Sequence, residues 1–458
     1  MTPCIRSAFI TKRSEKMKLR WLQLLLVTVL LAVPLAGCEN ESSTPETITL
    51  IIKTPVQELN SISDPNIRSV SAFLEKAAFA FARQYEKARI TPRVITFNYV
   101  NEAQAVTGSF GTDSAPDVLF GSFFNIASYI HTGRVVPLDD MITDTIRNDI
   151  ESTAWKMGMF GGKTYMIPYV DMQNILIYNK KFFRECGLDA FIGTGTEIQN
   201  WTLEEWEHIL DTLAARLPDG VYPLAIYGKN NQGDTHILSY IRAFGSEIFD
   251  AEGNFSFTDD KAVKALTWIR NGVQRGWYPP HPENLEMKDC SELFANSQLA
   301  IYMFNNANRA LYSNLNHYGF VNYPGNIATT FINGFEVFDN GDNARVQAAK
   351  DFLKYLYETE EWLELSAGNI PVSKTVLAKY ANRITMLNDF SANSVHVVDF
   401  MRNSPNWQGR DDSFRSVFWP NIHRLLAGTL TPEECARKLD SACNAALASG
   451  RRDSTLHK

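Results

Sequence analysis

The chain has 458 residues, of which 45% are hydrophobic and 21% are charged. This composition is that of a globular protein, it excludes an intrinsically disordered chain, and the length allows two or three domains. The mean hydropathy of −0.19 excludes a protein with many membrane spans. The first 37 residues hold six Lys or Arg and one Glu, so the rest has 38 basic and 50 acidic groups and a net charge of −12. An acidic body argues against binding nucleic acid, which needs clustered positive charge.

The N-terminal segment has the pattern of an export signal. Lys18 and Arg20 precede an apolar run at 21–33, and small residues follow it. Residues 35–38, Leu-Ala-Gly-Cys, resemble the bacterial lipobox, which is cut before a cysteine that then carries lipid. An uncleaved anchor helix is the alternative, although the apolar run is short for a membrane span.

The lipobox resemblance implies three segments at the start of the chain. We predict a lipoprotein signal peptide at 1–37, lipid including palmitate on Cys38, and a flexible tether at 38–46, where the sequence is polar. The mature protein would be anchored to the cell membrane and face the extracellular side or the periplasm. The sequence leaves open whether translation starts at Met1 or at Met17.

Strand and helix patterns alternate along the body of the chain. Apolar, β-branched runs indicate strands, and apolar residues at spacings of three and four indicate helices. In chain order these patterns predict a strand at 47–53, a helix at 73–87, strands at 93–97 and 115–120, a helix at 125–131, a strand at 223–227, helices at 236–244 and 261–275, a strand at 298–304, and mainly helices from 344 onward. The alternation predicts an α/β fold with a mostly parallel sheet covered by helices.

The body carries no motif for catalysis, a cofactor or a metal. Residues 161–164 end like a phosphate loop, but Met157 stands where the opening glycine belongs, which favours a hairpin strand at 163–164. The eight His lack zinc spacing, no nucleophile elbow occurs, and 250–254 fits a hairpin turn better than a calcium loop. We therefore predict no enzyme, cofactor or metal. The alternative is a lipid-anchored hydrolase whose carboxylates come from distant segments.

The four cysteines of the body are predicted to be buried free thiols. Cys435 and Cys443 lie in a segment with helical spacing, where eight residues rise roughly 12 Å, too far for a disulfide. A bridge between Cys186 and Cys290 remains open as the alternative.

Several segments together resemble one family, the extracellular solute-binding proteins of bacterial ABC importers, and within it the maltose-binding-protein-like sugar-binding group. Examples are Ala-Pro-Asp-Val at 115–118 and Trp-Thr-Leu-Glu-Glu-Trp at 201–206. The similar segments are 115–118, 133–140, 162–168, 177–183, 186–188, 200–206, 293–303, 349–360 and 368–372. Their order and spacing cover nearly all of the chain from residue 47 to about 447, although Asn296 or Ser297 stands where the family usually has glycine.

The resemblance implies an α/β, two-lobed periplasmic-binding-protein fold with a ligand cleft between lobes that crossover strands join. Ligands of open α/β sheets bind beyond the carboxyl ends of the strands, and interlobe clefts close around them. By analogy we place lobe one at 47–170 and 325–375, and lobe two at 171–324 and 376–450. Crossovers are expected near 169–174, 323–325 and 371–377.

Carbohydrates are bound by aromatic rings against their apolar faces and by planar polar groups on their hydroxyls. Within the family-like segments, the candidate ligand-binding residues are Phe123, Phe124, Tyr169, Asp171, Asp234, His236, Asn305, Asn306, Gly334, Trp407, Arg415 and Trp419. Core packing is the alternative for one of the two phenylalanines, and an N-cap role is the alternative for Asp234. Of the last two tryptophans, one is expected to touch the ligand. Four others on amphipathic helices are predicted to belong to the core: Trp201, Trp206, Trp268 and Trp362.

The resemblance thus predicts a monomeric extracellular solute-binding protein that captures a carbohydrate and delivers it to the membrane permease of an ABC transporter. Ligand contacts to both lobes would close the cleft without covalent chemistry. One alternative keeps the fold and binds a peptide, a polyamine or a metal complex. Others are a signalling sensor, the lipid-anchored hydrolase and a structural surface protein. The sequence names neither the sugar nor the permease.

Overall fold

The structure, a computed structural model, describes residues 47–59, 63–230, 232–306, 312, 314–383, 386–393, 395–397 and 413–456. The chain from residue 47 onward forms one compact unit. The predicted signal peptide, Cys38 with its tether, and Trp407 lie outside the described residues. None of the helices in the described ranges is long and apolar enough to cross a membrane.

The first group of strands is parallel and has a helix between its first two members. β1 (Thr47–Pro55) lies between β2 (Arg89–Phe97) and β3 (Val118–Ser122), and both are parallel to it. α2 (Val70–Gln84) begins where the Ser69 side chain accepts a hydrogen bond from a first-turn N–H, and it buries apolar residues at helical spacing. The predicted β-α-β opening is confirmed.

The second group of strands comes from the middle of the chain. β9 (Leu299–Asn305) is parallel to its neighbour β8 (Tyr222–Leu224), and β10 (Tyr318–Val321) is parallel to β7 (Ile198–Gln199). β9 and β10 are both antiparallel to β6 (Ile167–Asn179), which joins all of these strands into one sheet.

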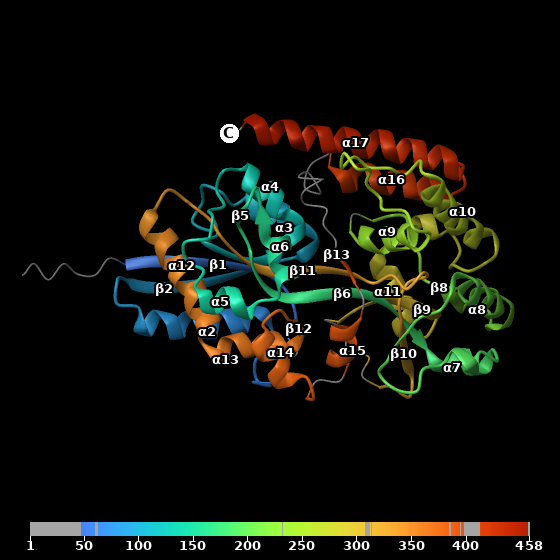
Figure 1. The fold of residues 1–458 in the computed structure, drawn as a ribbon, viewed down its shortest axis with the longest axis horizontal. Coiled ribbons are helices and arrows are strands. Elements are labelled where there is room, and N and C mark those ends of the chain that lie inside the picture. Colours follow the sequence, from blue (N-terminus) through green and yellow to red (C-terminus); the bar gives the residue numbers. More distant parts are fainter. Residues whose placement is uncertain are drawn as a thin grey trace, which may run out of the picture. The chain divides into compact units, whose positions relative to one another are not determined.

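β6 belongs to both groups of strands. Its residues 167–174 pair with β11 (Thr329–Val337), which also pairs with β3, and its residues 174–178 pair with β9. At Asn174, β6 therefore passes from one group to the other, and Figure 1 shows β6 and β11 running between the two groups. The structure has the crossover strands that the two-lobed fold requires.

The prediction of a mostly parallel sheet is wrong. β6 is antiparallel to β9, β10 and β11, and β11 is antiparallel to β3. The physical reason is that successive passes of the chain between two lobes run in opposite directions, so neighbouring crossover strands are antiparallel. The sequence analysis expected a crossover strand at 169–174, which lies within β6, but it did not predict β11 as a strand. Parallel pairs remain on the two flanks of the sheet.

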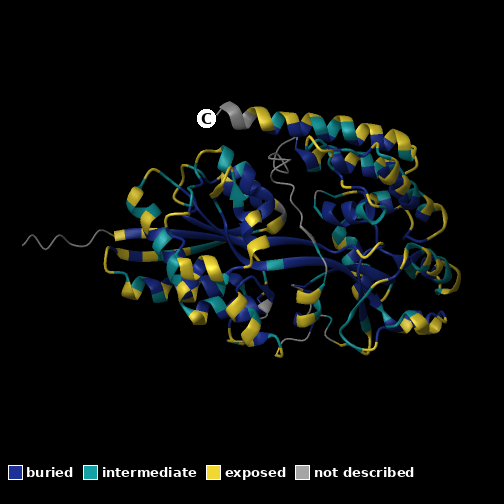
Figure 2. Ribbon diagram, in the orientation of Figure 1, coloured by how far each residue is buried: buried dark blue, intermediate teal, exposed yellow. Residues whose placement is uncertain are grey.

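Helices surround the sheet, with buried inner faces and exposed outer faces (Figure 2). The remaining helices are α3 (Glu102–Thr107), α4 (Ile126–His131), α5 (Asp144–Asp149), α6 (Ser152–Gly158), α7 (Lys180–Glu185), α8 (Leu203–Arg216), α9 (Asp234–Ala243), α10 (Asp260–Gln274), α11 (Met287–Ala295), α12 (Asn343–Glu358), α13 (Glu360–Leu363), α14 (Lys374–Tyr380), α15 (Leu387–Ala392), α16 (Phe414–Leu426) and α17 (Pro432–Leu456). The short strands are β4 (Met159–Phe160), β5 (Lys163–Thr164), β12 (Ile370–Pro371) and β13 (His396–Val397).

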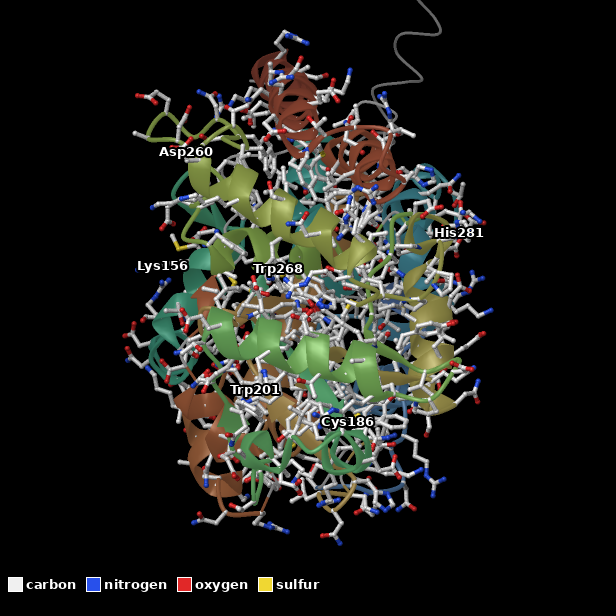
Figure 3. The ribbon with its side chains drawn as sticks, turned by 90° about the vertical axis from the view of Figure 1, so that its right-hand side faces the viewer. Lys156, Cys186, Trp201, Asp260, Trp268 and His281 are labelled. Carbon is white, nitrogen blue, oxygen red and sulfur yellow. The ribbon has the colours of Figure 1, made fainter. Side chains whose placement is uncertain are left out.

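Several local predictions are confirmed. The four tryptophans assigned to the core are at most 5% exposed, and Figure 3 labels two of them, Trp201 and Trp268. The four body cysteines are buried free thiols. β4 and β5 form the predicted hairpin, and a hydrogen bond from Asp250 N to Asn254 O closes the predicted turn. As predicted, the described part of the chain after residue 344 is mainly helical, in α12 to α17.

Candidate functional site

Two adjoining cavities form one cleft beside β6 and β11. Their volumes are about 510 and about 110 Å³. They share six lining residues, which are Tyr99, Asn174, Gln232, His236, Met287 and Phe331, and we call the joined space the front cleft. Its volume falls in the range of sites that enclose small-molecule ligands.

The front cleft opens where strands end and helices begin. Two 3₁₀ turns, η1 (Tyr99–Asn101) and η2 (Phe123–Asn125), follow β2 and β3 and form one side. The first turns of α9 and α11, together with β9, form the other side. Since β2 and β3 are both parallel to β1, their carboxyl ends meet at one edge of the sheet, the usual place for ligands in open α/β sheets.

Aromatic rings line part of the front cleft. The ring centroids of Phe124 and Phe331 lie 4.9 Å apart, and both residues line the smaller cavity. Phe123 contacts both rings but is only 1% exposed and belongs to the core. Tyr99 lines both cavities and is 37% exposed, which is unusual for a large apolar ring. Such rings offer flat apolar surfaces to a ligand.

A buried ion pair stands beside these rings. Arg415 on α16 donates from Nε to the Asp234 carboxylate on α9 at 2.6 Å, and their side chains are 11% and 0% exposed. The guanidinium carbon of Arg415 lies 5.3 Å from the centroid of the Phe124 ring, within range of a cation–π contact. Arg415 therefore connects α9 with the turn that follows β3.

A second carboxyl group, that of Glu102, lines the smaller cavity and is 1% exposed. Its Oε1 accepts a long hydrogen bond, 3.4 Å, from Ser122 N, while Oε2 has no hydrogen-bond partner in the described structure. Burial raises the pKa of Glu102 to about 7. Glu336 on β11 is also fully buried with both oxygens unpartnered, and burial and the charge of Glu102 raise the pKa of Glu336 well above its ordinary value.

Amide and hydroxyl groups form a chain along the β6 side of the cleft. Asn305 Nδ2 donates to Asn174 Oδ1 at 3.1 Å, and Asn174 Nδ2 donates to Thr235 Oγ1 at 3.2 Å. His236 hydrogen-bonds through Nδ1 to the Tyr323 hydroxyl, and burial lowers the pKa of His236 to about 3. The histidine is therefore neutral at physiological pH. These planar polar groups suit recognition of hydroxyl groups.

A second cavity of about 370 Å³, which we call the back cavity, lies against the same two strands. It is lined by Asp171 and Gln173 of β6 and by Thr330 of β11, together with residues around α6, β12 and α15. The Thr330 hydroxyl donates to the Asp171 carboxylate, and burial raises the pKa of Asp171 to about 6. The described residues hold no group of three His, Cys, Asp or Glu placed to bind a metal ion.

The family of the chain follows from its sequence. The profile described as "Bacterial extracellular solute-binding protein" matches residues 65–361. The chain belongs to this family. An uncharacterized ABC transporter extracellular-binding protein of Pyrococcus horikoshii is 23% identical over 369 residues, 77% of this chain and 80% of that protein. The diacetylchitobiose binding protein DasA of Streptomyces coelicolor is 22% identical over 282 residues, 58% of this chain and 62% of that protein.

Solved structures of solute-binding proteins share the fold. A chitin oligosaccharide binding protein matches with a TM-score of 0.69 and 18% identity, over 88% of this chain and 99% of that one. An ABC substrate-binding protein of Listeria monocytogenes, in complex with cycloalternan, matches with a TM-score of 0.67 and 16% identity, over 88% and 99% of the two chains. The predicted two-lobed periplasmic-binding-protein fold is confirmed, as is the resemblance to this family of binding proteins.

Within this solute-binding fold, the structure brings part of the predicted set together. Phe124, His236, Asn305 and Arg415 line the front cleft. Asp234 stands directly behind, as the partner of Arg415. The alternative N-cap role for Asp234 is not observed, because Gly233 is the N-cap residue and the aspartate is the first residue of α9.

The other predicted residues that the structure describes do not line the front cleft. The Tyr169 hydroxyl donates to Trp362 O, and its ring packs in the core against Phe73 with centroids 5.7 Å apart. The remaining ones are Phe123 and Trp419 in the core, Asp171 in the back cavity, Asn306, whose amide bonds the β6 backbone, and Gly334, where a Cβ would lie 2.3 Å from Ile167 O.

The sequence analysis missed four prominent residues of the front cleft, Tyr99, Glu102, Ser122 and Phe331. One signal was available for three of them. Tyr99 and Glu102 come directly after the strand predicted at 93–97, Ser122 likewise follows the strand predicted at 115–120, and the carboxyl end of a parallel strand is where site residues are expected. Phe331 gave no such signal, because β11 had not been predicted as a strand.

Proposed function

We propose that this solute-binding protein captures a carbohydrate in the front cleft and delivers it to the permease of an ABC transporter. The observation that carries the proposal is the arrangement of the cleft itself. The rings of Phe124, Phe331 and Tyr99 supply apolar faces, and the amides of Asn174 and Asn305 supply hydrogen-bonding groups in the same cleft. This combination suits a ring with apolar faces and a rim of hydroxyl groups. The names of its sugar-binding relatives support the same ligand class.

Capture rather than hydrolysis is supported by the charges of the cleft. Glycoside hydrolysis ordinarily uses two carboxyl groups on either side of the scissile bond. Among the described residues that line the front cleft, Glu102 supplies the single carboxyl group. Asp234 lies behind the wall and is bonded to Arg415. We propose that closure about β6 and β11, with lobe bounds near those of the sequence analysis, holds the ligand without chemistry.

A ligand screen tests the proposal on the chain from residue 39 onward, since every described element begins at or after Thr47. We expect one class of mono-, di- or oligosaccharide to raise the melting temperature. A ligand that binds only the folded state adds about 2.7 kcal/mol to the free energy of unfolding when its free concentration is 100 times its dissociation constant. Peptides and polyamines serve as the other arms, and a response to these alone would overturn the carbohydrate assignment. Small-angle scattering with the responding ligand should show a smaller radius of gyration, as closure requires.

We further propose that the mature protein is a monomer tethered to the outer face of the membrane by lipid on Cys38. The lipobox-like residues 35–38 support this anchor. In cells, the wild-type protein should partition into the detergent phase of a Triton X-114 separation, and Cys38→Ala should move it to the aqueous phase. Cys4→Ala is the matched control, because Cys4 belongs to the predicted signal peptide and its loss should change nothing. Detergent partitioning of Cys38→Ala would contradict the anchor.

A further inference from the structure

The smaller cavity of the front cleft contains buried polar atoms that make no hydrogen bond of normal geometry. Glu102 is 1% exposed and its Oε2 makes no such hydrogen bond, although the side chains of Asn125 and Tyr129 interact with its carboxyl group. Ser122 is 2% exposed and its Oγ makes none either, although the Tyr99 hydroxyl interacts with it. Both residues line this cavity. A buried polar atom without a partner is destabilising, and native structures rarely keep two together without a use for them. The carboxylate oxygen accepts hydrogen bonds, and the serine hydroxyl can accept as well as donate, so a single donor group of a ligand can bond to both.

The charges around this cavity favour a positive group. Arg415 is the one cation that lines the smaller cavity among the described residues, and its charge is already matched by Asp234 at 2.6 Å. The charge of Arg415 also favours the ionised form of Glu102, so one cation serves two carboxyl groups, those of Asp234 and Glu102. Glu336 lies close enough for the charge of Glu102 to disfavour its ionisation, and neither of its oxygens has a partner. A cation from the ligand would relieve both the unmet hydrogen bond and the unbalanced charge.

The rings of the cavity favour the same kind of group. Tyr99, Phe124 and Phe331 line it together with the two unpartnered oxygens. Aromatic faces attract cations, and the position of the Arg415 guanidinium 5.3 Å from the Phe124 centroid shows that one of these rings already accepts such a contact. A carboxyl group flanked by aromatic rings is a suitable environment for an ammonium ion.

We propose that Glu102 and Ser122, with the neighbouring rings of Tyr99 and Phe124, form a subsite for an ammonium group, and that the captured carbohydrate carries an unacetylated amino sugar at this end. The inference rests on the proposed carbohydrate function and makes it more specific. The remainder of the front cleft, with Asn174 and Asn305, then holds the neutral part of the ligand.

Three disaccharides that differ only at C2 test the inference by calorimetry at pH 7. These probes are the β-1,4-linked dimers of glucosamine, N-acetylglucosamine and glucose, which present an ammonium, an acetamido and a hydroxyl group. We expect the glucosamine dimer to bind at least about tenfold more tightly than the other two, as one hydrogen bond between charged groups allows. Glu102→Gln keeps the shape but removes the charge, and should abolish this preference.

Two further variants keep the test independent of misfolding. Glu151→Gln makes the same chemical change at the back cavity and should leave the preference intact. Ser122→Ala removes only the side-chain hydroxyl. It should weaken binding of the glucosamine dimer several-fold more than binding of the glucose dimer. Circular dichroism and melting temperature establish that each variant folds.

The outcomes separate this inference from the proposed function. If the acetylated or neutral dimers bind as tightly as the glucosamine dimer, the ammonium subsite is wrong and carbohydrate capture stands. Spermidine supplies an ammonium source without a sugar. Binding of spermidine alone, lost in Glu102→Gln, supports the ammonium subsite and overturns the carbohydrate. A dissociation constant above 1 mM for every probe, or a preference that survives Glu102→Gln, overturns the subsite.

Discussion

The front cleft and the back cavity lie against the same two strands, yet their polar groups are used differently. Successive side chains of β6 alternate between them: Met172 and Asn174 line the front cleft, and Asp171 and Gln173 line the back cavity. Along β11, Phe331 lines the front cleft and Thr330 the back cavity in the same way. One pair of crossover strands thus provides a wall for both spaces.

The carboxyl groups show the difference most clearly. In the back cavity, Asp171 is bonded by the Thr330 hydroxyl, and Gln173 Nε2 donates to Phe390 O at 2.9 Å, while Gln173 Oε1 has no partner in the described structure. In the front cleft, Glu102 Oε2 and Ser122 Oγ make no hydrogen bond of normal geometry. Burial and polarity alone therefore do not distinguish a ligand site from a cavity beside crossover strands. The front cleft differs from the back cavity in that its carboxyl group lies among aromatic rings and has an oxygen without a hydrogen bond of normal geometry, and four predictions test this contrast.

The largest effect is expected when the buried ion pair at the front cleft is broken. Asp234→Ala leaves Arg415, which is 11% exposed, without its carboxylate, and breaking such pairs costs about 3 to 5 kcal/mol. Denaturant unfolding at pH 7 measures the loss. The control is Asp140→Ala, which breaks a pair with Lys350 in which the aspartate is 66% exposed, and should cost at most about 1 kcal/mol. Equal losses in the two variants would contradict the buried character of the front pair.

The second effect is a fall in stability as the pH rises. The pKa of Glu102 is about 7 in the folded protein against an ordinary value of 4.5, so between these pH values the folded state holds more protons than the unfolded state. The contribution of this carboxyl group to the free energy of unfolding is complete below pH 4.5 and is lost as the pH rises through 7. The total loss is about 3 kcal/mol. Glu102→Gln should remove this loss.

The back cavity supplies the comparison for this titration. The pKa of Asp171 is about 6 against an ordinary value of 3.8, so its contribution is lost over a lower range of pH. Unfolding free energies at pH 4, 6 and 7.5 therefore separate the two groups. Asp171→Asn should reduce the fall between pH 4 and 6, to which Glu102 also contributes, and Glu102→Gln should reduce the fall between pH 6 and 7.5, to which the buried Glu336 also contributes. An unchanged fall between pH 6 and 7.5 in Glu102→Gln would contradict the unpartnered state of this carboxyl group.

These residues also show how far the sequence could be read. The β1-α2-β2 opening was predictable because strand runs and helical spacing are local patterns. Phe124, His236 and Asn305 were found because they follow predicted strands or loops in family-like segments. In each case the decisive information lies within a few residues of the side chain.

The missed and misplaced residues depend on contacts between distant segments. Glu102 is buried near Glu336 of β11, a strand whose run includes Asn333 and Gly334 and gave no strand signal. Tyr169 follows a proline in a family-like segment, but its hydroxyl bonds the backbone of Trp362 and its ring belongs to the core. Neither environment is determined by neighbouring residues in the sequence.

A smaller effect is expected from removing the exposed ring of the front cleft. Tyr99→Ala should lower the affinity for the carbohydrate that responds in the screen about tenfold. The reason is the loss of a contact with an aromatic face, which contributes about 1 kcal/mol or more to binding. Since Tyr99 is 37% exposed, the unfolding free energy should fall less than on truncation of a fully buried tyrosine. Phe79→Ala is the control, because Phe79 on α2 is 53% exposed and lines neither cavity. Equal affinities of the two variants would show that Tyr99 makes no contact with the ligand.

The smallest effect is expected at the back cavity and acts through closure. When two lobes rotate about β6 and β11 to close the front cleft, the opposite face must widen. Thr153 is exposed at the start of α6 and lines the back cavity, so the larger side chain of Thr153→Trp should favour the widened, closed state. A ligand that binds the closed state should then bind about threefold more tightly, by a shift of population alone. Calorimetry compares this variant with Thr153→Ser, which adds no volume. Weaker binding in Thr153→Trp would mean that the back cavity narrows on closure. The front cleft and the back cavity would then both become narrower when the ligand binds.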